Sequence, residues 1–100
     1  MNREVDPAVI AELWAVICER ADNPSESSYT TRLLSDPKGI DKVLEKVGEE
    51  ATEFILAVKN GKNDRTVEET ADLLYHLLVA LRAANLDLDD VMQELGKRRK

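Results

Sequence analysis

The sequence predicts an all-α protein, a bundle of four to five helices. The chain has 100 residues, of which 43% are hydrophobic and only 4% aromatic. That composition suits a single domain, residues 1–100, with a core of Leu, Val, Ile and Ala. The apolar residues also recur at helical spacing along most of the chain. Because so short a chain leaves much of its surface unburied, we expect the core to be completed by dimerisation.

The first helix is expected to begin at Asp6 and Pro7, an N-cap followed by proline at the first helical position. Up to about Ala21 its apolar residues recur at helical spacing: Ile10, Leu13, Trp14 and Ile17. The sequence Asp22-Asn23-Pro24 then interrupts the helix. The hydroxyl-rich segment 25–34 follows, and we expect it to form a short helix or an ordered loop.

Two long helices are expected in the middle of the chain. Between Ile40 and about Lys59 one arc of the helical wheel is apolar, formed by Val43, Leu44, Val47, Ala51, Phe54, Ile55 and Val58. Asn60 and Gly61 form a stop signal, and Asp64 is a candidate cap for the next helix. That helix is expected to end near Asn85 and to be followed by a last helix from about Leu88. A short loop between two long helices makes them antiparallel neighbours.

Each of the two long helices carries a stripe of acidic residues that is typical of a metal-binding site. On the first, one stripe holds Lys42, Lys46, Glu49, Glu50 and Glu53; on the second, a stripe holds Glu69, Asp72 and His76. Like charges three and four residues apart destabilise a helix by a few tenths of a kcal/mol per pair, so a compensating cation is expected. Oxygen ligands without a neighbouring Cys suit Mg²⁺, or Mn²⁺, rather than Zn²⁺. Across the groove between antiparallel helices, these carboxylates predict a divalent-metal site.

The alternative interpretation of the acidic residues is a solvated helix face. A chain with 20 acidic residues in 100 contains some acidic pairs by chance. Lys46 would then neutralise Glu49 and Glu50 as in an ordinary surface helix. On this interpretation the protein is a non-catalytic helical dimerisation module.

Composition argues against several classes of partner and location. The net charge of −6 and a pI near 4.8 disfavour binding to nucleic acid or to an anionic membrane. The sequence has no apolar stretch of about 18 residues, so we expect no membrane span, and no signal peptide is evident. Cys18 is the only cysteine, which excludes an intramolecular disulfide and fits a reducing compartment. We therefore expect a cytoplasmic protein.

Three runs of residues carry a resemblance to a known family: Glu26-Ser27-Ser28-Tyr29-Thr30, residues 46–53 (KVGEEATE) and residues 71–78 (ADLLYHLL). Together they resemble phosphoribosyl-ATP pyrophosphatases, within the all-α nucleoside-triphosphate pyrophosphatase (MazG-like) superfamily. The acidic signature E-E-x-x-E followed by E-x-x-D indicates only the superfamily. The Ser-Ser-Tyr-Thr and Tyr-His-Leu-Leu runs resemble the histidine-pathway member of that superfamily in particular. The resemblance extends from about Leu13 to Arg99.

The resemblance implies a reaction and a pathway. The α–β phosphoanhydride of phosphoribosyl-ATP would be hydrolysed to phosphoribosyl-AMP and pyrophosphate, the second step of L-histidine biosynthesis, with Mg²⁺ required. The phosphoribosyl-AMP cyclohydrolase that acts next would be a separate chain. The alternative is a house-cleaning NTP or dNTP pyrophosphatase of the same superfamily, which would share the metal site and differ in its base and sugar contacts.

Carried over onto matching positions, the resemblance implies that the metal ligands are Glu50, Glu53, Glu69 and Asp72. Glu49 would be either a further ligand or the base that activates water. Mg²⁺ binds a few carboxylates together with substrate phosphates, so such a groove leaves positions for the anhydride.

Other residues are candidates for substrate binding. Lys46 and Lys42 share the stripe of the first motif and could contact phosphate oxygens, with surface salt bridging as the alternative. Arg32, with Ser28 and Thr30, offers a guanidinium and hydroxyl groups suited to phosphate; the alternative is helix capping and turn formation. His76 could contact the base or ribose, or be a structural histidine.

Overall fold

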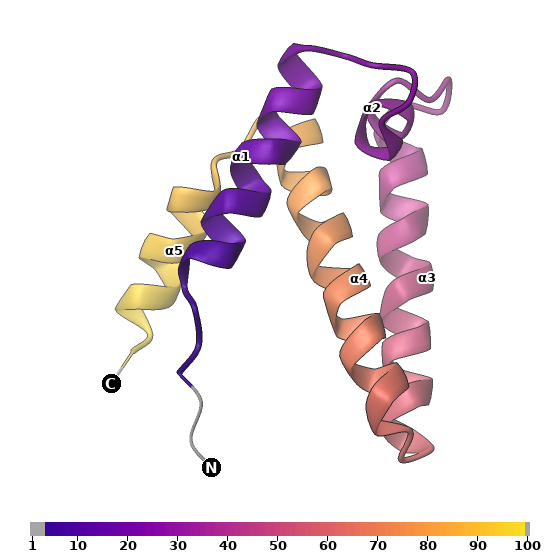
Figure 1. Ribbon diagram of the computed structural model, residues 1–100, viewed down its shortest axis with the longest axis vertical. Helices are drawn as coiled ribbons and strands as arrows, with labels where there is room; N and C mark the ends of the chain where they lie inside the picture. The colour runs from indigo at the N-terminus through magenta and orange to yellow at the C-terminus, as the bar shows by residue number, and fades with distance from the viewer. Residues whose placement is uncertain (1–3, 100) are drawn as a thin grey trace.

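The computed structural model describes residues 4–99, which form five α-helices and no strand (Figure 1). The helices are α1 (Ala8–Asp22), α2 (Tyr29–Leu34), α3 (Ile40–Lys59), α4 (Asn63–Ala83) and α5 (Leu88–Lys97). The predicted all-α class is confirmed. The hydroxyl-rich segment 25–34 proves to be a turn followed by the short helix α2.

Short polar side chains fix the beginnings of three helices. Helix α1 begins at Ala8 with Pro7 at its N-cap position, one residue later than predicted, and Asp6 Oδ1 accepts a hydrogen bond from the Ala8 N–H at 3.0 Å. Ser28 Oγ accepts from the Thr31 N–H at 3.1 Å, and Asp87 Oδ1 accepts from the Asp89 N–H at 2.9 Å. These bonds satisfy N–H groups that have no partner within the helix.

The boundaries of α4 differ from the prediction at both ends. It begins at Asn63 after Lys62, so Asp64 lies in the first turn and is not the cap. There its negative charge still complements the helix dipole. The helix ends at Ala83, before Asn85, because Asn85 adopts a left-handed φ of 60°. This conformation lets the Leu86 N–H bond back to the Leu81 carbonyl at 2.9 Å.

Helices α3 and α4 form the long antiparallel hairpin that the short loop predicts (Figure 1). The turn uses Gly61, whose φ of 66° is costly for residues with a Cβ. After it, the Lys62 N–H donates to the Ala57 carbonyl at 3.0 Å and closes the end of α3. The hairpin thereby sets the register between the two acidic motifs.

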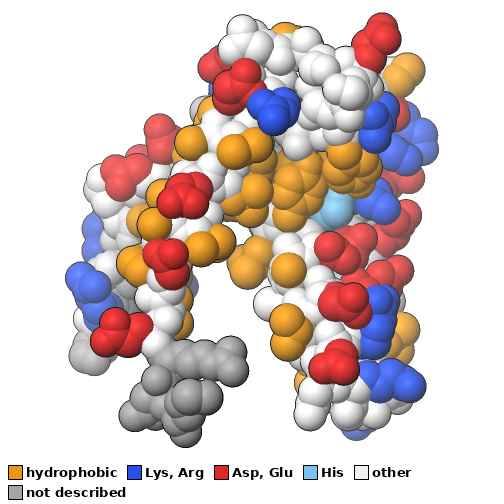
Figure 2. Space-filling model, in the orientation of Figure 1, with side chains coloured by type: hydrophobic (Ala, Val, Ile, Leu, Met, Phe, Trp, Pro, Cys, Tyr) orange, Lys and Arg blue, Asp and Glu red, His pale blue; other side chains and the backbone are white. Residues whose placement is uncertain are grey.

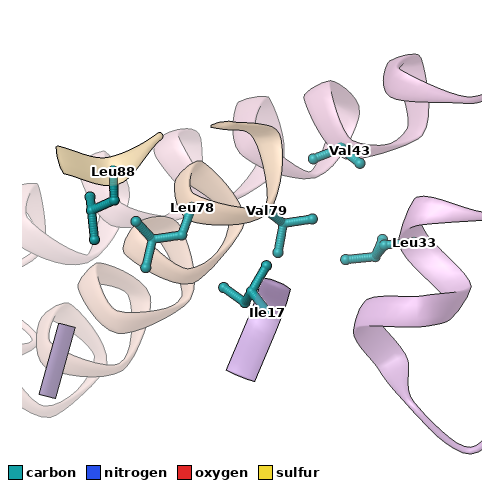
Figure 3. Packing of buried hydrophobic residues seen from close by; sticks show 6 residues of the cluster. All are labelled: Ile17, Leu33, Val43, Leu78, Val79 and Leu88. Carbon is teal, nitrogen blue, oxygen red and sulfur yellow. The ribbon is translucent and has the colours of Figure 1, made fainter. Parts of the chain in front are cut away.

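The core is small and receives side chains from every helix. Its buried cluster consists of Ile17, Leu33, Val43, Leu78, Val79 and Leu88 (Figure 3). Val79 and Leu78 come from α4, which therefore runs through the centre of the fold. Partly buried side chains such as Trp14 and Tyr75 surround the cluster.

Helices α1 and α5 diverge from the α3–α4 hairpin, and apolar side chains line the space between them (Figures 1 and 2). The radius of gyration is 14.9 Å, compared with about 13 Å for a compact domain of this length. Leu74 and Leu77 of α4 remain 43% and 41% exposed beside an apolar cavity of about 380 Å³. A single copy thus leaves a hydrophobic face uncovered.

None of the described helices combines the length and the hydrophobicity needed to cross a bilayer.

Candidate active site

The hairpin brings carboxylates from both acidic motifs together. Glu50 of α3 and Glu69 and Asp72 of α4 each place one carboxylate oxygen so that all three atoms lie within 4.8 Å of one another. Glu69 and Asp72 are three residues apart and share a helix face, while Glu50 approaches from the neighbouring helix. In Figure 2 acidic side chains gather along this hairpin, with basic side chains beside them.

Two of these carboxylates are buried, which is unusual for charged groups. Glu50 is 8% exposed and Glu69 is 2% exposed, and the Oε2 atom of each has no hydrogen-bond partner. A buried carboxylate oxygen without a hydrogen-bond partner is costly, so a cation bound at these two atoms would be favourable. Asp72 is exposed and opens the cluster to solvent. An oxygen-only set with one open side fits a hard divalent cation that also binds ligands from solution.

Glu53 and Glu49 lie at the edge of this cluster. The pKa of the Glu53 carboxyl is raised, because a hydrogen bond to the Glu69 carboxylate and the negative charge of Glu69 favour the protonated form. Glu53 thus lies beside Glu69, but it is not among the three carboxylates whose oxygens converge. Glu49 is exposed and pairs with Lys46 at 3.1 Å.

Two cationic side chains flank the carboxylates. Lys46 of α3 lies 3.1 Å from Glu49 and 4.0 Å from Glu50, and these partners, Glu49 first, raise the pKa of its amino group. Arg65 of α4 forms an ion pair with Glu69. Lys42 is half-buried and forms no ion pair within residues 4–99.

Helix α2 adds aromatic and hydroxyl groups next to the cluster. His76 is 5% exposed, and its Nδ1 lies 2.7 Å from the backbone carbonyl of Asp72. A carbonyl only accepts hydrogen bonds, so Nδ1 carries the proton and Nε2 is free to accept from the Tyr29 hydroxyl at 3.0 Å. Thr30 hydrogen bonds to the Tyr75 hydroxyl, whose pKa is raised chiefly by burial.

The candidate substrate-binding residues of α2 have structural partners in this state. Ser28 caps the helix, and Thr30 is buried against Tyr75. Arg32 donates to the Glu26 carbonyl at 3.0 Å and lies 6.0 Å from the centre of the Tyr29 ring. These contacts match the capping alternative for Ser28, whereas the exposed guanidinium of Arg32 remains accessible from solution.

Comparison with known proteins identifies the family. The family model for phosphoribosyl-ATP pyrophosphohydrolase matches residues 10–99. The chain is 72% identical over 96 residues to the phosphoribosyl-ATP pyrophosphatase of Methanoregula boonei, covering 96% of this chain and 92% of that protein. It is 65% identical over 95 residues to the enzyme of that name from Methanosphaerula palustris, covering 95% and 96%. The chain belongs to the phosphoribosyl-ATP pyrophosphatase family. The resemblance inferred from three short runs is thus confirmed.

In this member of the phosphoribosyl-ATP pyrophosphatase family, sequence reasoning missed two residues beside the cluster, Arg65 and Tyr29. Arg65 precedes Glu69 by four residues, a spacing that could have indicated the ion pair. Tyr29 belongs to the Ser-Ser-Tyr-Thr run and has no spacing signal of its own. Its contact with His76 spans 47 residues of sequence and follows only from the position of α2.

Proposed function

We propose that this chain hydrolyses the α–β phosphoanhydride of phosphoribosyl-ATP, releasing pyrophosphate and phosphoribosyl-AMP in the second step of L-histidine biosynthesis. One structural observation supports this proposal in addition to family membership. Glu50, Glu69 and Asp72 converge on one point, and two of them bury an oxygen without a partner. This geometry supports a cation-binding site at which an acidic protein could bind a negatively charged polyphosphate.

The proposed cofactor is Mg²⁺, with Mn²⁺ as a substitute, held by Glu50, Glu69 and Asp72 together with the adjacent Glu53. A cation held there would supply positive charge to offset the charge on the departing pyrophosphate and would lower the pKa of an attacking water. The exposed side of the cluster at Asp72 leaves room for the phosphate oxygens. A solvated helix face does not explain why Glu50 and Glu69 are buried.

The base proposed to take a proton from the attacking water is Glu49. Its carboxylate is exposed, lies one residue from the buried Glu50, and is held by Lys46 at 3.1 Å. A positioned carboxylate within hydrogen-bond reach of water is the usual requirement for such a base.

Phosphate binding is proposed for the cationic side chains near the cluster. The ammonium group of Lys46 lies 4.0 Å from Glu50, and Lys42 precedes it by one helical turn. Arg32 supplies a guanidinium from α2, and the base and ribose would lie near Ser28, Thr30 and His76. Thr30 hydrogen bonds to Tyr75 of α4, and His76 of α4 hydrogen bonds to Tyr29 of α2, which supports a positioning role for Thr30 and His76 as well.

A homodimer is proposed as the active assembly. The exposed leucines of α4 and the apolar cavities beside α1 and α5 would be covered by a second copy. Burying this surface would supply the hydrophobic stabilisation that so small a core lacks.

The cytoplasm is the proposed location, because a biosynthetic nucleotide substrate is made there.

The test is pyrophosphate release by the purified protein from phosphoribosyl-ATP, ATP and dCTP, each with Mg²⁺ and then with EDTA. Release from phosphoribosyl-ATP that EDTA abolishes is the expected result. Preference for dCTP would instead indicate a house-cleaning enzyme with the same metal site. Release from none of the three would favour the non-catalytic module.

A further inference from the structure

Arg65 has an unusual position between solvent and the buried carboxylates. Its side chain is 57% exposed, yet its guanidinium forms an ion pair with Glu69, whose side chain is only 3% exposed. The second nitrogen, Nη1, lies 3.0 Å from Glu68, which is exposed. One arginine on the surface of α4 therefore reaches the most buried carboxylate of the cluster.

The electrostatic need for this contact is strongest when no cation occupies the cluster. A buried carboxylate that lacks a counter-charge is strongly destabilising. Glu69 also lies close to Glu50, Asp72 and Glu53, so repulsion adds to the cost of burial. Lys46 contacts Glu49 and Glu50 but forms no ion pair with Glu69. In the cation-free protein, Arg65 supplies the positive charge at this carboxylate.

We propose that Arg65 is a built-in counter-cation of the metal site, which stabilises the cation-free protein through Glu69 and lowers the affinity of the site for a divalent cation. The inference rests on the metal site of the proposed function. Two positive groups that compete for one carboxylate repel each other. A group that stabilises the free state more than the bound state must weaken binding by the same factor.

The surroundings of Arg65 allow its side chain to leave Glu69. A cavity of about 210 Å³ adjoins it, lined in part by Glu53, Asn60 and Lys62. The exposed Glu68 offers an alternative partner that Arg65 already contacts. Arg65 can therefore retreat toward solvent without leaving its charge unpaired when a cation engages Glu69.

An orienting role for Arg65 would have the opposite effect on affinity. In that case the arginine would hold Glu69 in the geometry that the cation requires, and its loss would weaken metal binding, by about 10–100-fold for a supporting residue. The sign of the change in affinity therefore separates the two roles.

The experiment compares wild type with Arg65→Gln by calorimetric titration of Mg²⁺ and by thermal unfolding in EDTA, at one protein concentration. We expect the Mg²⁺ dissociation constant of the variant to decrease by about three- to tenfold, the scale of the repulsion between two unit charges about 4 Å apart in water, because the Arg65 side chain is largely exposed. In EDTA its Tm should fall by about 4–8 °C, a modest destabilisation for a domain of this size. A variant that folds only with Mg²⁺ would be the extreme form of the same result.

Arg98→Gln is the matched control. Arg98 also pairs with a glutamate four residues away, Glu94, but both side chains are exposed, at 73% and 53%. Its replacement should leave both the Mg²⁺ affinity and the Tm nearly unchanged, because exposed pairs contribute little. Arg65→Lys keeps the positive charge and should retain most of the wild-type affinity and Tm.

A double-mutant cycle tests whether Arg65 acts through Glu69. In a Glu69→Gln background, Arg65→Gln should no longer lower the Tm in EDTA. Unchanged or weaker Mg²⁺ binding by Arg65→Gln alone would overturn the inference. Absence of Mg²⁺ binding by the wild-type protein would instead refute the metal site itself, so the two failures are distinguishable.

Discussion

The hydroxyl of Tyr29 lies 3.0 Å from Nε2 of His76 and joins α2 to the face of α4 that carries the acidic motif. The same imidazole bonds through Nδ1 to the backbone carbonyl of Asp72, at 2.7 Å. One buried ring thus connects the short helix α2 with the backbone of a proposed metal ligand. Together with the Thr30–Tyr75 hydrogen bond and the buried Leu33, this link holds the six-residue helix α2 beside the cluster.

Replacing Tyr29 by phenylalanine removes this hydroxyl and leaves the buried Nε2 of His76 without its donor. We expect the free energy of unfolding to fall by about 1–2 kcal/mol, the cost of an unsatisfied buried acceptor. Chemical denaturation monitored by circular dichroism measures this change.

Tyr75→Phe is the companion variant, because it removes the hydroxyl that bonds to Thr30 and leaves His76 intact. It should also destabilise the protein. If Tyr29→Phe alone raised the KM for phosphoribosyl-ATP without altering stability, Tyr29 would be a substrate contact and its bond to His76 would be energetically unimportant.

The helices were predictable from local sequence, whereas the contacts of α2 were not. Periodicity and the short loop at Gly61 suffice to predict an antiparallel α3–α4 hairpin, and the hairpin brings Glu50 opposite Glu69. The burial of Glu69 depends on the packing of α3 against α4, which periodicity does not specify. The bond between Tyr29 and His76 depends on how residues 35–39 fold α2 back against α4. Such a contact has no local signal.

Replacing Glu53 by glutamine should reduce pyrophosphate release by about 100-fold or more, because even residues that only support metal ligands commonly cost 10–100-fold. The substitution keeps the shape of the side chain and removes its charge. Helical circular dichroism should be unchanged, since Glu53 is exposed. Turnover assays with saturating Mg²⁺ test the expectation.

Glu45→Gln is the control for this variant. Glu45 lies on the same helix but pairs with Lys38 at 3.0 Å, outside the cluster. It should retain nearly full activity. Near-wild-type turnover by Glu53→Gln would remove Glu53 from the mechanism and leave the three converging carboxylates as the metal ligands.

Removal of the cation should lower the stability of the wild-type protein. A ligand present at 100 times its dissociation constant stabilises the native state by about 2.7 kcal/mol. We therefore expect Mg²⁺ at that excess to raise the Tm above its value in EDTA, as measured by differential scanning calorimetry. Glu69→Gln should lose most of this increase, because Glu69 contributes a buried oxygen that has no other partner. An equal increase in the variant would place the bound cation elsewhere.

Replacing Leu77 by glutamate should disrupt the proposed dimer. Leu77 is 41% exposed and lines both apolar cavities of about 380 Å³ beside α5. A charge at this position would have to be desolvated in an interface, which is strongly unfavourable. Sedimentation velocity should show a shift from dimer to monomer, accompanied by a lower Tm. Val67→Glu is the control, because Val67 is also on α4 but is 72% exposed and lines neither cavity. A wild-type protein that sediments as a monomer would contradict the proposed assembly, and Leu77 would then be a tolerated surface residue.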